Sequence, residues 1–89
     1  MLFNIVWHPK TESDLNNIHK EICERIIKKV RLLEINPYRF LDRLEGYNLY
    51  KLHIGDYRVV LNISESDSEI KIFLVGHCSK VYNELPRRL

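Results

Sequence analysis

The chain has 89 residues, and its 14 Lys and Arg against 12 Asp and Glu leave a formal net charge of only +2. This length predicts one small domain over residues 1–89, and 45% hydrophobic residues exclude an intrinsically disordered chain. No apolar run approaches the roughly 18 residues of a membrane-spanning helix. Two cysteines without metal-ligand spacing exclude a disulfide scaffold and a structural zinc site, so we expect no metal, no cofactor and a cytoplasmic location.

The first half of the chain predicts a strand followed by helix. Residues 2–7 form a short apolar run, which is typical of a buried strand. Thr11 with Asp14 three residues later predicts a helix that begins with Thr11 at the N-cap. An apolar stripe of helical period follows, with spacings of 3, 4, 4, 4 and 3. Its members are Leu15, Ile18, Ile22, Ile26, Val30 and Leu33. The pattern fits one helix over 11–35, or a helical hairpin with a break near 19–21.

The second half predicts an antiparallel sheet. Two alternating segments, 47–54 and 57–63, flank a two-residue turn that has glycine where a type II′ turn requires it. That loop length sets the strand register, so His53 faces Arg58 and Lys51 faces Val60. Because side chains alternate, Lys51, His53 and Arg58 share one face of the hairpin.

The remaining segments complete an α+β domain. A polar loop over 64–69 leads to a strand over 70–76, in which Ile70, Ile72 and Leu74 share a face. A short helix over 79–85 follows. The order of elements predicts an N-terminal strand, a helical hairpin packed on one face of a three-stranded antiparallel meander, and a short C-terminal helix. This arrangement leaves the other face of the sheet open.

The open face carries the residues of most chemical interest. Lys51, His53 and Arg58 are cationic or ionisable groups in cross-strand contact, and such groups repel one another unless an anion neutralises them. Arginine offers a planar fork for phosphate, lysine a point charge, and histidine a group that moves protons near neutral pH. The alternative interpretation is a solvated strand face whose charges serve solubility and edge protection.

A second group of candidate residues follows the last strand. We expect His77, Lys80, Arg87 and Arg88 to add phosphate-binding charge to the same end of the sheet, with Tyr82 as a proton donor or acceptor. The alternative for Tyr82 is that it docks the C-terminal helix on the sheet.

Two stretches carry a family resemblance. Residues 43–60, RLEGYNLYKLHIGDYRVV, resemble the core signature of RelE/ParE-superfamily toxins, in which a leucine-x-glycine turn leads into a basic hairpin closed by Gly-x-Tyr-Arg. The closing segment of that family resembles Val75-Gly76-His77 and Val81-Tyr82. The order of elements in the first half also matches.

The resemblance implies the toxin of a type II toxin–antitoxin system, a ribosome-dependent endoribonuclease that cuts messenger RNA without a metal. The RNA's own 2′-hydroxyl attacks the adjacent phosphate. By position, Lys51 and His53 would activate that hydroxyl and stabilise the pentacovalent phosphate. Arg58 would clamp the phosphate or protonate the leaving oxygen, and Tyr82 would stack on or orient the nucleotide. The implied partners are a RelB-like antitoxin, in a heterotetrameric complex, and the ribosome.

Two positions depart from the family pattern. The second basic strand position is His53 rather than lysine, and Cys78 stands where ribosome-dependent nucleases usually have arginine. A thiol cannot make two charge-assisted hydrogen bonds to phosphate. His77, Lys80 or the Arg87-Arg88 pair would have to substitute, or the activity is weak. A ParE-like inhibitor of DNA gyrase and a toxin with degenerate activity are the alternatives.

Overall fold

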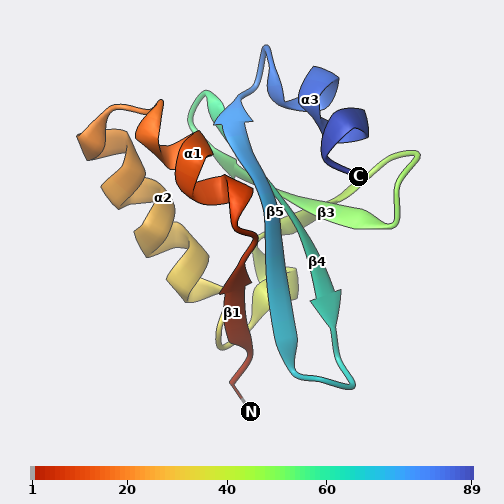
Figure 1. Ribbon diagram of the computed structural model, residues 1–89. Coiled ribbons are helices and arrows are strands. Elements are labelled where there is room, and N and C mark those ends of the chain that lie inside the picture. The colour runs from red at the N-terminus through yellow and green to blue at the C-terminus, as the bar shows by residue number, and fades with distance from the viewer. Residues whose placement is uncertain (1) are drawn as a thin grey trace.

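The computed structural model describes residues 2–89, and these form a five-stranded sheet with helices on both faces (Figure 1). The sheet order is β1-β5-β4-β3-β2; β1 is parallel to β5 and every other pair is antiparallel. The predicted α+β class is confirmed. The elements are β1 (Asn4–Trp7), α1 (Lys10–Asn16), α2 (Lys20–Leu32), the 3-10 helix η1 (Pro37–Arg39), β2 (Leu41–Leu44), β3 (Leu49–Ile54), β4 (Tyr57–Ser64), β5 (Glu69–His77) and α3 (Val81–Arg88).

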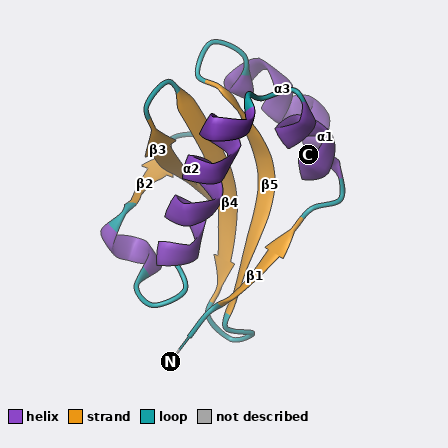
Figure 2. Ribbon diagram, turned by 90° about the vertical axis from the view of Figure 1, so that its left-hand side faces the viewer, coloured by secondary structure: helices purple, strands orange, loops and turns teal. Residues whose placement is uncertain are grey.

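The helical region is a hairpin of two helices, α1 and α2, and α2 lies across the front of the sheet in Figure 2. The predicted stripe packs on the sheet: its last three members are buried and its first three are half-buried against the same core. The N-cap assignment of Thr11 is wrong, because Pro9, with φ −51°, already has helical geometry and starts the helix at Lys10. Thr11 is instead buried, and its hydroxyl donates to the His8 carbonyl at 2.6 Å.

The β3–β4 hairpin has the predicted register, with His53 opposite Arg58 and Lys51 opposite Val60. Gly55 has φ +56°, the left-handed conformation that glycine adopts without steric cost. The meander has one strand more than expected, because β2 pairs with β3. Its four residues, Leu41–Leu44, are too few to show a strand period in the sequence.

The predicted alternation of side chains along β5 is wrong beyond Phe73, because the strand contains a bulge there. Val60 pairs with Leu74 while Leu61 pairs with Ile72, so Phe73 is an extra residue in the β4–β5 ladder. The bulge moves Leu74 to the face opposite that of Ile70 and Ile72.

The face that was expected to be open is therefore partly covered. A second apolar cluster lies on this face, and α3 covers the cluster. Its buried members are Leu44, Leu49, Val60, Leu74, Val81 and Leu85. The C-terminal helix also extends beyond its predicted end at Leu85 and continues through Pro86 to Arg88.

Candidate functional site

Lys51, His53 and Arg58 lie together on the α3 face of the sheet, beside the apolar cluster. Lys51 and Arg58 are half-buried and His53 is exposed. The ion pairs found within residues 2–89 join Arg87 to Glu84 and Arg88 to Asp14, so these three residues form no ion pair there. We call these three residues the basic face. Asp42 of β2 lies opposite Lys51 across the β2–β3 ladder, but the two side chains form no ion pair.

Arg58 is held in place by the turn that precedes it. Its Nη1 group donates to the carbonyls of Gly55 and Tyr57, at 2.8 Å each. A guanidinium carries five N–H donors in a planar fork. Both bonds use Nη1, so the donors on Nε and Nη2 have no protein acceptor in the described part of the chain. The geometry presents an oriented fork suited to a phosphate.

Sequence reasoning missed a further cation at this turn, Arg25 of α2. Its Nη2 atom lies 3.8 Å from the position that a Cβ on Gly55 would occupy. Arg25 therefore approaches Gly55 from the helix side, while Arg58 binds the Gly55 carbonyl. No local motif links a helix residue to a hairpin thirty positions later, so only packing reveals this contact.

Tyr82 lies at the start of α3, and 40% of its surface is exposed. The preceding residue, Val81, packs against Gly76, which is the β5 partner of Arg58. A groove lies along the other flank of α3, and its lining includes Glu84 and Arg88 but not Tyr82. Since successive helix residues are about 100° apart, Tyr82 projects from the opposite flank of α3, away from the groove and from α1.

His77 is placed differently from the expectation, because it faces Tyr57 rather than Arg58 across the β4–β5 ladder. The His77 and Tyr57 rings meet edge to face at 5.4 Å, and Tyr57 packs against the core under α2. The Ser79 backbone N–H donates to His77 Nδ1 at 3.1 Å. Ser79 Oγ lies 2.8 Å from the same nitrogen. His77 is thus separated from the basic face by the sheet.

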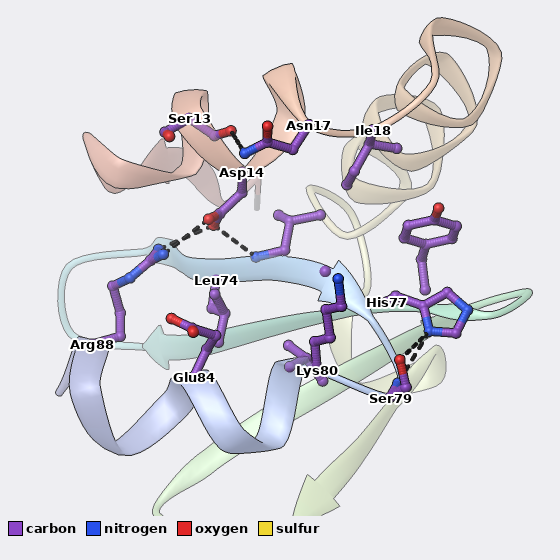
Figure 3. A pocket seen from close by; sticks show the side chains of 14 residues that line it. Ser13, Asp14, Asn17, Ile18, Leu74, His77, Ser79, Lys80, Glu84 and Arg88 are labelled. Carbon is purple, nitrogen blue, oxygen red and sulfur yellow. Dashed lines mark hydrogen bonds and ion pairs between the residues drawn. The ribbon is translucent and has the colours of Figure 1, made fainter.

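The groove of about 850 Å³ runs between α1 and α3 over the end of β5, and Lys80 and Glu84 line its α3 side (Figure 3). Arg88, which was expected to bind phosphate, is occupied here by Asp14. Its Nη2 donates to Oδ1 at 2.9 Å and its Nη1 to Oδ2 at 3.0 Å. The hydrogen bond to Asp14 raises the pKa of Arg88. Arg87 is exposed and lies 3.6 Å from Glu84.

The two cysteines are free and half-buried. Cys78 Sγ lies 3.9 Å from His77 Nδ1, and Cys23 Sγ donates to the carbonyls of Leu15 and Ile18. No cluster of three or more His, Cys, Asp or Glu side chains suited to a metal ion occurs in residues 2–89. None of the helices described is long and apolar enough to cross a membrane.

The fold is that of RelE toxins. The chain superimposes on an E. coli RelE double mutant in the free state with a TM-score of 0.78 and 20% identity, covering 100% of this chain and 99% of the other. The superposition on RelBE2 of Mycobacterium tuberculosis has a TM-score of 0.78 and 19% identity, and it covers 86% of this chain and 99% of the other. For the RelE–RelB complex of Pyrococcus horikoshii the TM-score is 0.74 and the identity 27%, with 86% of this chain and 96% of the other covered. No curated protein matches the sequence.

Fold and sequence together define a toxin of a type II toxin–antitoxin system, of the RelE/ParE superfamily. Residues 5–82 match the sequence model of the family described as ParE toxin of type II toxin-antitoxin system, parDE. The chain belongs to this family.

Proposed function

We propose that this toxin is a ribosome-dependent endoribonuclease that cuts messenger RNA at the basic face. The observation that carries the proposal is the grouping of Lys51, His53 and Arg58 on one face, where none of them forms an ion pair with a carboxylate of the described residues. A protein that acted by surface contacts alone would have no need of such a set.

In the proposed reaction the RNA supplies its own nucleophile. His53 accepts the proton of the 2′-hydroxyl while that oxygen bonds to the adjacent phosphorus, and the bond from phosphorus to the 5′-oxygen breaks. Lys51 and Arg58 stabilise the charge of the pentacovalent phosphate. Arg58 serves as a clamp rather than an acid, because a guanidinium does not give up its proton. Water protonates the leaving oxygen, and Tyr82 orients the nucleotide.

The ribosome, messenger RNA and an antitoxin are the proposed partners. A net charge of +2 gives little affinity for free RNA, so the ribosome supplies most of the binding energy, and the activity belongs in the cytoplasm. Structures of RelE with RelB from three organisms support a RelB-like antitoxin, with which we expect a heterotetrameric complex. Lys80 and Arg87 remain candidates for contacts to flanking phosphates, since both are exposed.

The direct test is cleavage of a defined message by the purified chain, mapped by primer extension with and without translating ribosomes. We expect cuts within the message only when ribosomes are present. An intact message under both conditions would contradict the proposal.

A second candidate function is inhibition of DNA gyrase, as in ParE-type toxins. The match to the ParE toxin family and the presence of Cys78 at a usual arginine position favour it. Induction of a DNA-damage response with translation intact would support this function over RNA cleavage. Expression without any growth arrest would indicate a degenerate toxin.

A further inference from the structure

Asp14 of α1 makes the polar contacts that fasten the C-terminal end of α3 to the sheet. Its carboxylate binds Arg88 through two hydrogen bonds and also accepts the backbone N–H of Val75 at 3.1 Å. Arg88 in turn donates to the Phe73 carbonyl at 2.8 Å. Both charged side chains are largely shielded, with 9% of Arg88 and 13% of Asp14 exposed. The four bonds join α1, β5 and α3 at one point, and Figure 3 shows the contact between Asp14 and Arg88.

This point of attachment lies on an edge of β5 that α1 packs against and that β1 does not reach. β1 pairs only with Glu69–Ile72, so within residues 2–89 the part of β5 beyond Ile72 has no neighbouring strand on that side. The Phe73 carbonyl and the Val75 N–H face outward there, and Arg88 and Asp14 satisfy them. The Asp14–Arg88 ion pair is therefore part of the sheet edge. It differs from an exposed surface ion pair, which contributes little to the stability of the fold.

The last turn of α3 depends on this attachment. Pro86 has no N–H to give to the carbonyl of Tyr82, four residues earlier, so the helix lacks one of its own bonds there. Val81, Leu85 and Arg88 lie on one stripe of the helix, and the first two are buried in the apolar cluster. With Arg88 fixed as a third anchor, the helix cannot rotate about its axis, and the direction of Tyr82 is set.

We propose that Asp14 is a positioning residue, which holds α3 through Arg88 and so fixes the direction of the Tyr82 ring on the α3 face of the sheet. Asp14 lies on a different helix and makes no contact with Lys51, His53 or Arg58. Its role in RNA cleavage rests on the proposed function, whereas its hold on α3 does not.

The test begins with hydrogen exchange of the α3 amides, which needs no substrate. Asp14→Asn keeps the size of the side chain and an oxygen for Val75, but removes the charge that binds Arg88. We expect the amides of the last turn of α3 to exchange about tenfold faster, because a hydrogen bond to a charged group is lost. Glu12→Gln, an exposed carboxylate on the same helix, is the matched control and should leave exchange unchanged. Unchanged exchange in Asp14→Asn would overturn the proposal.

A double-mutant cycle then separates positioning from loss of folded protein. In wild-type background we expect Asp14→Asn to lower the cleavage rate of ribosome-bound message by about tenfold or more, since misplacement of a reacting group is costly. In a Tyr82→Ala background it should have no further effect, and Arg88→Lys should retain more activity than Arg88→Met. An equal loss in both backgrounds would overturn the positioning role. If the wild-type chain cuts no message, the proposed function fails, and hydrogen exchange still decides whether Asp14 holds α3.

Discussion

His53 and Arg58 face each other directly across the β3–β4 ladder, and neither forms an ion pair with a carboxylate within residues 2–89. Two such groups side by side destabilise a sheet when both are charged. Arg58 is nevertheless fixed by two carbonyls of the preceding turn, so it cannot swing away from His53 without losing those bonds. The pair is suited to an anion that binds both side chains.

The first prediction concerns catalysis. Arg58→Ala should lower the rate of message cleavage by about 100- to 1000-fold, the typical loss when one group that stabilises transition-state charge is removed. Lys51→Ala should have a smaller effect in the same direction. Growth arrest on expression and primer extension are the measurements, and Arg31→Ala, an exposed arginine of α2, is the matched control. Full toxicity of the Lys51→Ala, Arg58→Ala double variant would exclude the proposed site.

The second prediction concerns anion binding in the absence of RNA. Inorganic phosphate should raise the melting temperature of the wild-type chain, because a ligand that binds only the folded state stabilises it, by about 1.4 kcal/mol at tenfold excess over Kd. The increase should be smaller in Arg58→Ala. Sodium chloride at equal ionic strength controls for screening. Equal increases in both proteins would mean that phosphate does not bind at the basic face.

The third prediction concerns the β3–β4 turn. Gly55→Ala should destabilise the fold by about 1–2 kcal/mol, because a side chain at φ +56° is strained. Gly76→Ala is the comparison: its Cβ would lie 3.8 Å from Val81, an ordinary contact, so we expect little loss of stability. Urea unfolding of both variants measures the difference. A Gly76→Ala variant as unstable as Gly55→Ala would contradict this account of the turn.

The fourth prediction concerns alkaline pH. A hydrogen bond to Glu65 raises the pKa of Tyr38 from 10.0 to about 12. The unfolded chain therefore loses the Tyr38 proton before the folded chain does, and the stabilisation present below pH 10 is lost as the pH rises toward 12. Because Tyr38 is 44% exposed, the effect on the free energy of unfolding is small. Urea unfolding at several pH values should show a weaker decline in Tyr38→Phe than in wild type. An identical decline in the two proteins would contradict a stabilising role for the Tyr38–Glu65 hydrogen bond.

The local patterns of the sequence were sufficient for the helical stripe, the hairpin register and the grouping of Lys51, His53 and Arg58. Each depends on neighbours in the chain: a helical period, a two-residue turn, and the alternation of side chains along a strand. The resemblance to RelE/ParE toxins rested on the same hairpin residues, and the comparisons confirm the family.

Only the tertiary structure decided which face of the sheet the residues beyond Phe73 occupy. The bulge at Phe73 reverses the alternation beyond it, so His77 joins Tyr57 on the face opposite Arg58. Arg88, which the sequence presents as one of two basic residues near the C-terminus, is bound by a carboxylate 74 positions earlier.

The physical reason for this division is the range of the interactions. Periodicity and turn chemistry act over a few residues and are visible in the chain. A bulge in a ladder and a salt bridge on a strand edge depend on segments that meet only after the sheet has formed. The sequence by itself determined the basic face of this toxin, and the packing of α1 and α3 on β5 decided which of its other cations remain free to serve that face.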